Sequence, residues 1–115
     1  MISIGIDIVK IDRLDKLSKD KKFLNKIFTN KEIDYCNLYS DCHIHLSVKY
    51  AGKEAVKKAL LSNSIVDNIS LKDIEILNKK DKSPYVIIRT INNLNCIISI
   101  SHDGNYAIAF TLIEK

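Results

Sequence analysis

The stretch HLSVKYAGKEAVKKALL, residues 45–61, predicts the longest helix of the chain. Proline is absent from it, and Gly52 is its one glycine. Lys49, Lys53 and Lys57 form a basic row, which we expect along the helix surface. The apolar residues recur at spacings of three to five, as one buried helical face requires; they are Leu46, Tyr50, Ala51, Ala55, Ala59 and Leu60.

Glu54 and Lys58 lie four residues apart in this stretch, so their side chains are neighbours on the helix. An exposed ion pair of this spacing contributes only about 0.3–0.5 kcal/mol to stability. A plain surface pair is therefore the simplest interpretation of these two residues when they are taken alone.

Residues 2–9 predict a strand in which isoleucines occupy every second position. We expect the isoleucines on the buried face, so Asp7 points the other way, beside Gly5. The glycine leaves space over the strand for a ligand or a second backbone. Asp7 is then either a solvated carboxylate on the outer face or a functional acid.

Thr29 followed by Glu32 forms a capping box and predicts the start of another helix. Farther along, residues 71–77 and 84–88 predict two strands joined by a polar turn. Pro84 is tolerated at the start of the second strand, where it need not donate a hydrogen bond to the ladder.

Residues 96–101 and 106–113 predict two more strands. Asp103-Gly104 between them is a strong hairpin signal. Ser101 and His102 then lie at the tip of a strand, where their side chains can meet a ligand without being buried. A solvated turn histidine is the simpler interpretation of His102 taken alone.

The composition indicates one folded domain that spans residues 1–115. Apolar residues make up 46% of the chain and charged residues 28%, which is too apolar for a disordered protein. No uncharged run approaches the roughly 20 apolar residues needed to cross a bilayer, and the chain opens without a leader pattern. We therefore expect a cytoplasmic protein with no membrane partner. The net charge of +4 favours anionic partners such as phosphates, nucleic acid or an acidic protein.

The three cysteines, Cys36, Cys42 and Cys96, show no Cys-x-x-Cys spacing. We expect them to be free thiols that pack in the structure. A zinc site built from Cys42, His43 and His45 is an alternative, although the spacing matches no common structural zinc pattern.

Five segments carry a joint pattern: Gly5-Ile6-Asp7-Ile8-Val9 with Ile11 and Arg13, Phe28-Thr29 with Glu32 and Tyr35, Tyr50-Ala51-Gly52-Lys53-Glu54-Ala55 with Lys58-Ala59-Leu60, Asp73-Ile74-Glu75-Ile76, and Ser99-Ile100-Ser101-His102-Asp103 with Tyr106-Ala107. In this order and at this chain length they resemble holo-[acyl-carrier-protein] synthase, the short bacterial type of 4′-phosphopantetheinyl transferase. The resemblance covers nearly the whole chain.

The resemblance implies an α+β protein with the 4′-phosphopantetheinyl transferase fold, in which a long helix packs on an antiparallel sheet. It also implies a homotrimer with active sites between neighbouring subunits. The implied reaction transfers 4′-phosphopantetheine from coenzyme A to a serine of apo-acyl carrier protein and releases adenosine 3′,5′-bisphosphate.

Asp7 and Glu54 match the family's ligands for Mg²⁺, which needs few carboxylates because waters and phosphate oxygens complete its shell. Lys58 is implied as a catalytic residue beside them, an electrostatic clamp on the same phosphates. The base that takes the serine proton stays open between a water and one of the two carboxylates. The residues implied to bind coenzyme A are Lys49, Lys58, Pro84, Ser101 and His102.

The chain departs from the family pattern at three places. Lys49 stands where relatives usually carry arginine, so the charge is kept but the bidentate fork is lost. Residues 61–64 replace a usual Gly-Thr-Gly loop, and Lys82-Ser83-Pro84 replaces a usual Gly-Lys-Pro. These departures leave the implied metal site untouched but affect the loops around the substrate.

Acyl carrier proteins are acidic, and the candidates for the surface that meets one are Arg13, Lys22 and Lys26. Two alternative functions compete with this interpretation. A small basic nucleic-acid-binding domain would use the lysines, but the strands carry no interleaved aromatic platform, so we expect no nucleic-acid partner. A Mg²⁺-dependent phosphohydrolase would use water in place of the serine.

Overall fold

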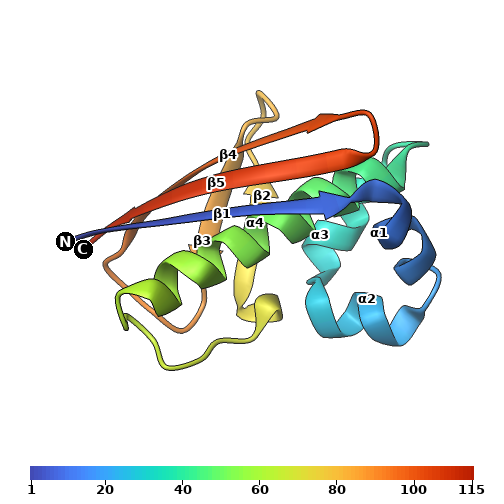
Figure 1. The fold of residues 1–115 in the computed structure, drawn as a ribbon. Helices are drawn as coiled ribbons and strands as arrows, with labels where there is room; N and C mark the ends of the chain where they lie inside the picture. The colour runs from blue at the N-terminus through green and yellow to red at the C-terminus, as the bar shows by residue number, and fades with distance from the viewer.

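Helix α4 packs along one face of a three-stranded antiparallel sheet in the computed structural model, which describes residues 1–115 (Figure 1). Three short helices gather at one end of α4, and a separate β-hairpin packs behind it. The elements are β1 (Ile2–Lys10), α1 (Ile11–Leu17), α2 (Lys21–Ile27), α3 (Asn30–Cys36), α4 (Cys42–Ser62), a 3-10 turn (Leu71–Asp73), β2 (Ile74–Asn78), β3 (Pro84–Ile88), β4 (Asn95–Asp103) and β5 (Tyr106–Glu114).

The strand order in the larger sheet is β1-β5-β4, and β2 pairs only with β3. The two chain ends meet where the N-terminal amine of Met1 donates to the carbonyl of Lys115 at 3.3 Å. At the other end of the sheet, the β4–β5 turn contains Gly104 with a φ of 56°, the left-handed conformation that glycine adopts without strain. The α+β class with a long helix on an antiparallel sheet is as predicted.

The predicted elements are present with shifted ends. The long helix begins at Cys42, one turn earlier than the expected residue 45. The strand expected over 71–77 starts at Ile74, because the side chain of Ser70 caps a 3-10 turn by accepting from the backbone of Lys72 at 3.3 Å. The capping box of Thr29 and Glu32 at the start of α3 is confirmed.

Two further findings bear on the expectations from composition. All three cysteines are free thiols, as predicted. None of the helices is both long enough and apolar enough to cross a bilayer.

Strand β1 and helix α4 approach so closely that only glycine fits between them. A Cβ built on Gly5 would overlap the carbonyl oxygen of Ala55 and lie 3.0 Å from the backbone nitrogen of Ala59. The prediction that Gly5 makes room for a second backbone is therefore confirmed. That backbone belongs to α4.

The prediction that the isoleucines of β1 are buried is wrong for the single chain. Ile2, Ile4, Ile6 and Ile8 are 56–61% exposed, whereas Ser3 and Val9 on the opposite face are 2% and 4% exposed. The close approach at Gly5 explains the difference, because α4 can cover only the face of the sheet that carries small residues.

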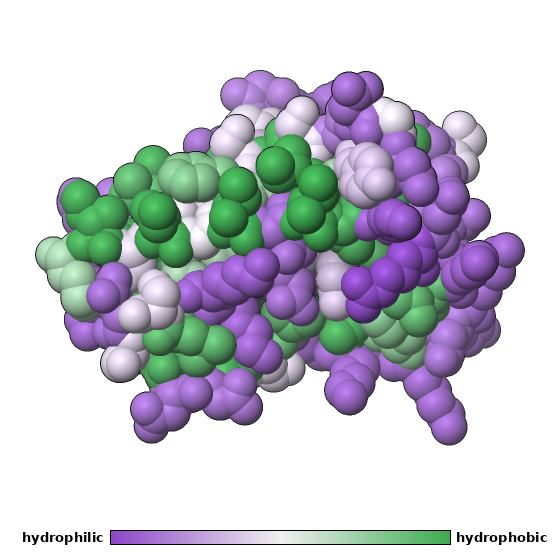
Figure 2. Space-filling view, in the orientation of Figure 1, coloured by the Kyte–Doolittle hydropathy of each residue, from purple (hydrophilic) through white to green (hydrophobic).

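The exposed isoleucines belong to a larger apolar surface, which we call the outer face (Figure 2). Its cross-strand register places Ile4 beside Leu112, Ile6 beside Phe110, and Ile8 beside Ile108. Strand β4 adds Ile97, which pairs with Leu112. The exposed large apolar residues of the outer face are Ile2, Ile4, Ile6, Ile8, Ile97, Tyr106, Ile108 and Phe110.

The expected basic row on the surface of α4 is also wrong. Lys49 is 2% exposed and Lys53 is fully buried, and only Lys57 remains partly exposed. Both buried lysines point toward β2, whose backbone carbonyl groups have no strand to pair with on that side. The ammonium groups satisfy these carbonyls.

Lys53 and Glu32 form a fully buried ion pair at 2.7 Å. Lys53 also donates to the carbonyl of Leu71 at 3.0 Å, and Glu32 accepts from the backbone of Thr29 at 2.9 Å and of Ile76 at 2.8 Å. Burial lowers the pKa of Lys53, although Glu32 opposes that shift. Removing one partner of such a pair costs about 3–5 kcal/mol, so this network fixes β2 and α3 on α4.

The two glycines that face packed atoms give a matched test of the close approach. Gly5→Ala should lower the free energy of unfolding by roughly 3 kcal/mol or more, because the new methyl group meets backbone that cannot move independently. Gly52→Ala is the control: its Cβ would lie 3.0 Å from the flexible end of the Ile98 side chain, and alanine favours the helix by about 1 kcal/mol. Urea unfolding measures both. A Gly5→Ala variant as stable as Gly52→Ala would contradict the close approach.

Candidate functional site

Asp7 and Lys58 meet where β1 runs beside α4. The two side chains form an ion pair at 3.0 Å, and Lys58 also donates to the carbonyl of Ile6 at 3.0 Å. The Asp7 side chain is 15% exposed and that of Lys58 is 55% exposed. Asp7 thus points to the α4 side, away from the isoleucines, as predicted. An ion pair this open to water contributes little to stability.

Glu54 lies one helical turn before Lys58, and Tyr50 one turn before Glu54. Burial, the Glu54 carboxylate with its hydrogen bond, and Asp7 all raise the pKa of the Tyr50 hydroxyl, while Arg13 lowers it. Because Lys58 follows Glu54 by one helical turn and pairs with Asp7, both carboxylates lie on the Lys58 side of the β1–α4 contact. The structure brings together the predicted group of Asp7, Glu54 and Lys58.

Tyr50 is the residue that sequence reasoning missed at this group. It was assigned only to the buried face of the helix, yet it is half-buried and its ring lies 5.9 Å from the Arg13 guanidinium. Its spacing of four residues from Glu54 was the available signal.

The donor set of this group fits a hard divalent cation. Asp7 uses only Oδ1 in its ion pair with Lys58, which leaves the second carboxylate oxygen for another ligand. No third histidine, cysteine or acidic side chain joins Asp7 and Glu54 in a cluster that could hold a metal ion. Cys42, His43 and His45 form no such cluster either, so the alternative zinc site is wrong. Two carboxylates beside open solvent suit Mg²⁺, which keeps waters and takes phosphate oxygens.

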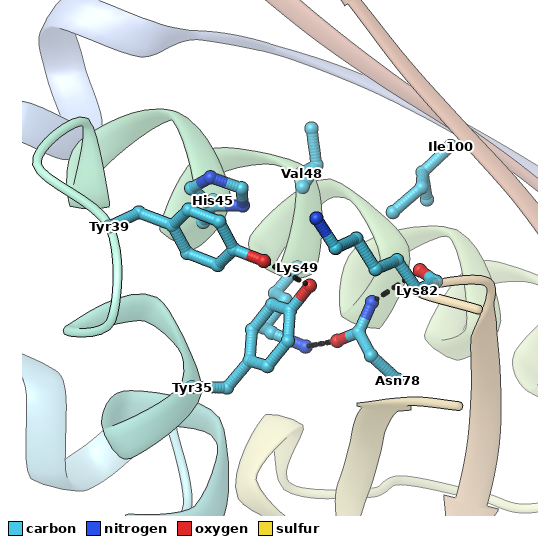
Figure 3. Close-up of a pocket in the computed structure, with 8 residues that line it drawn as sticks. All are labelled: Tyr35, Tyr39, His45, Val48, Lys49, Asn78, Lys82 and Ile100. Carbon is cyan, nitrogen blue, oxygen red and sulfur yellow. Dashed lines mark hydrogen bonds between the residues drawn. The ribbon is translucent and has the colours of Figure 1, made fainter. Parts of the chain in front are cut away.

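A second candidate region is a cavity of about 250 Å³ between α3, α4 and the β2–β3 turn (Figure 3). Its rim carries stacked rings: Tyr39 and His45 lie 3.9 Å apart at an interplanar angle of 22°, and the hydroxyls of Tyr35 and Tyr39 are 3.3 Å apart. The eight lining residues are Tyr35, Tyr39, His45, Val48, Lys49, Asn78, Lys82 and Ile100. None of them is acidic.

Lys49 is held inside the protein at the floor of this cavity. Its ammonium donates to the carbonyl of Ile76 at 2.6 Å and to the side chain of Asn78 at 2.6 Å. Burial lowers its pKa. Burial likewise lowers the pKa of His45, against the opposing effect of Asp41 at 3.4 Å. Lysine charge therefore dominates the cavity.

The remaining predicted residues divide between the two faces of the sheet. His102 pairs with Ala107 on the α4 face and is close enough to His45 to lower its pKa. Ser101 pairs with Ile108 and so belongs to the outer face. Both are exposed near the end of β4, as expected.

Pro84 starts β3 opposite Asn78, beside the cavity. The site residues of one chain therefore form two groups on different sides of α4. Lys49 and Glu54 are five residues apart, which turns about 140° around the helix axis. A single chain does not bring the Asp7 group and the Lys49 cavity onto one surface.

Residues 3–111 match the family described as the 4′-phosphopantetheinyl transferase superfamily. The chain belongs to this superfamily. It is 43% identical over 112 residues to the holo-[acyl-carrier-protein] synthase of Thermodesulfovibrio yellowstonii, covering 96% of each chain. It is 37% identical over 120 residues to that of Aquifex aeolicus, covering 97% of this chain and 98% of the relative.

Solved structures agree with the sequence relatives. The holo-(acyl-carrier-protein) synthase of Bacillus anthracis in complex with CoA (3′,5′-ADP) is 30% identical and superposes with a TM-score of 0.82, covering 96% of this chain and 94% of that one. The Helicobacter pylori enzyme in complex with coenzyme A is 32% identical with a TM-score of 0.79, covering 96% and 99%. The resemblance noted from the sequence is thereby confirmed, and with it the assignment as a transferase.

Proposed function

We propose that residues 1–115 form one holo-[acyl-carrier-protein] synthase domain of the cytoplasm. It transfers 4′-phosphopantetheine from coenzyme A to a serine of apo-acyl carrier protein and releases adenosine 3′,5′-bisphosphate. The observation that carries this proposal is the convergence of Asp7, Glu54 and Lys58 at the β1–α4 contact in a chain of this superfamily. The relatives that bind coenzyme A support the choice of donor.

Asp7 and Glu54 would hold Mg²⁺ at the pyrophosphate of coenzyme A. When bound, the ion supplies charge neutralisation for the departing bisphosphate. Lys58 reaches the same place with a side chain that is 55% exposed, and the bond of its ammonium to Asp7 can be exchanged for one to a phosphate oxygen. The serine proton passes to one of the two carboxylates or to a water beside them.

The cavity beside Lys49 is the proposed place for the nucleotide phosphates of coenzyme A. Its lining carries two lysines and no acid, and the stacked Tyr39 and His45 offer a flat surface next to them. Pro84 pairs with Asn78 and His102 lies near His45, and both of these neighbours line the cavity, which supports the assignment of Pro84 and His102 to coenzyme A binding. Ser101 would reach a donor bound to a neighbouring subunit, because it lies on the outer face.

A homotrimer explains both the exposed outer face and the divided site. Soluble monomers rarely expose contiguous apolar surface of this kind, and identical copies packed through the three strands would bury it. Assembly would also place the cavity of one chain opposite the Asp7 group of its neighbour. The active site is then completed between subunits.

The first test is transfer itself. Asp7→Asn and Glu54→Gln should each stay folded, because neither carboxylate belongs to the buried network, yet lose most of the transfer activity. The readout is the mass gain of one phosphopantetheine on apo-carrier protein in the presence of coenzyme A and Mg²⁺. Asp67→Asn, an exposed carboxylate elsewhere, is the control and should transfer normally.

Near-normal rates in either site variant at saturating Mg²⁺ would refute the metal assignment. Cleavage of coenzyme A without any mass gain on the carrier would instead favour the phosphohydrolase alternative.

The second test concerns assembly. The protein should sediment as a trimer, and Phe110→Lys, in the middle of the outer face, should dissociate it and reduce transfer, because a charge would be buried without a partner. Ile87→Lys is the matched control, since Ile87 is a similarly exposed apolar residue on β3, away from the outer face. Full activity in a monomeric preparation would rule out a site shared between subunits.

The third test concerns the carrier. Arg13→Glu should raise the carrier KM roughly tenfold at low salt and flatten its salt dependence, because Arg13 lies with Lys10 and Lys16 beside a hollow at α1. Lys22 and Lys26, both exposed on α2, are the other basic candidates for the carrier surface. Lys115→Glu, at the far end of the sheet, is the control (Figure 1). An unchanged carrier KM with a raised coenzyme A KM would show that Arg13 serves the nucleotide.

A further inference from the structure

Lys82 holds an unusual backbone conformation at the rim of the cavity. Its φ is 72°, in the left-handed region that a residue with a side chain adopts at a cost in conformational energy. The conformation is held by two hydrogen bonds, because the Lys82 carbonyl accepts from the Asn78 side chain at 2.9 Å and its N–H donates to Lys79 at 2.9 Å. The resemblance to the family puts a glycine at this position, where no such cost arises.

The side chain of Lys82 extends into the cavity from the β2–β3 turn (Figure 3). Its ammonium lies 6.0 Å from the centre of the Tyr39 ring and forms no ion pair with any carboxylate of the chain. Backbone strain kept at a cavity rim is a known mark of a functional position. The strain here places a free cation beside the aromatic stack.

Lys49 cannot supply this free cation. The residue is only 2% exposed, and its ammonium already binds the Ile76 carbonyl and the Asn78 side chain. His45 is biased toward its neutral form, since burial lowers its pKa. Of the eight lining residues, Lys82 alone offers a charge that is both exposed and without an internal partner.

We propose that Lys82, and not Lys49, binds the 3′-phosphate of coenzyme A and gives the enzyme its preference for coenzyme A over 3′-dephospho-coenzyme A. The proposal rests on the proposed function, which places the pyrophosphate at Asp7 and Glu54. The other anionic group of the donor is a phosphate monoester with up to two charges near neutral pH. A single exposed ammonium in a cavity without acids suits that group.

Binding of two small nucleotides tests the proposal without any transfer assay. The protein should bind adenosine 3′,5′-bisphosphate at least tenfold more tightly than adenosine 5′-monophosphate by calorimetry, which is the size expected of one charge-assisted contact. Lys82→Gln should lose most of this difference, and Lys82→Arg should keep it. Lys80→Gln removes an equal charge from an exposed position of the same turn and should keep it as well.

Lys82→Gly separates binding from folding. Glycine accepts the observed φ without strain, so the melting temperature should stay the same or rise while the discrimination between the two nucleotides is lost. A structural role for Lys82 predicts the opposite, a lower melting temperature with discrimination retained. Full discrimination in both Lys82→Gln and Lys82→Gly would overturn the proposal.

The transfer assay distinguishes this proposal from the proposed function. The ratio of the KM for 3′-dephospho-coenzyme A to the KM for coenzyme A should fall about tenfold in Lys82→Gln and stay unchanged in Lys80→Gln. Wild-type transfer with an unaltered ratio in Lys82→Gln would refute the role of Lys82 and leave the proposed function standing. If the protein showed no transfer activity but discriminated between the nucleotides through Lys82, the role of Lys82 would stand and the proposed function would be refuted.

Discussion

The structure depends on the contact between the backbones of β1 and α4 at Gly5. No side chain separates the two elements there, so the carbonyl of Ala55 lies directly over the strand. Asp7 is two residues farther along the same face of β1, and this short distance lets it meet Lys58 at 3.0 Å. A larger residue at position 5 would push the helix outward and separate the carboxylate from the lysine. One steric constraint therefore sets both the sheet–helix layer and the geometry of the candidate site.

On its other side α4 contacts the β2–β3 hairpin through side chains. Strand β2 pairs only with β3, so its other edge has no neighbouring strand. The ammonium groups of Lys49 and Lys53 satisfy carbonyls of β2, and Glu32 accepts the N–H of Ile76. This fixes the hairpin at a defined height over the helix. The turn that carries Lys82 then closes the cavity rim. The buried charges of Lys49, Lys53 and Glu32 therefore also determine where the free ammonium of Lys82 lies.

Sequence patterns predicted the helices and strands well, but they predicted less well which of their residues are buried. The long helix, the first strand and the capping box at Thr29 follow from local spacing and hydrogen bonding, which the sequence contains. Alternation in residues 2–9 shows that the strand has two faces but not which one meets the helix. That choice depends on the approach at Gly5. Lysine is usually exposed, and the burial of Lys49 and Lys53 depends on carbonyls more than 20 residues away in the chain. The site residues remain predictions that rest on resemblance and on the geometry found.

Tyr50 links the two surfaces that the proposed reaction must bring together. Its ring lies 5.9 Å from the Arg13 guanidinium, and burial together with Glu54 and Asp7 raises the pKa of its hydroxyl. If an acidic carrier docks at Arg13, as proposed, its carboxylates would compete with the Tyr50 ring for this guanidinium.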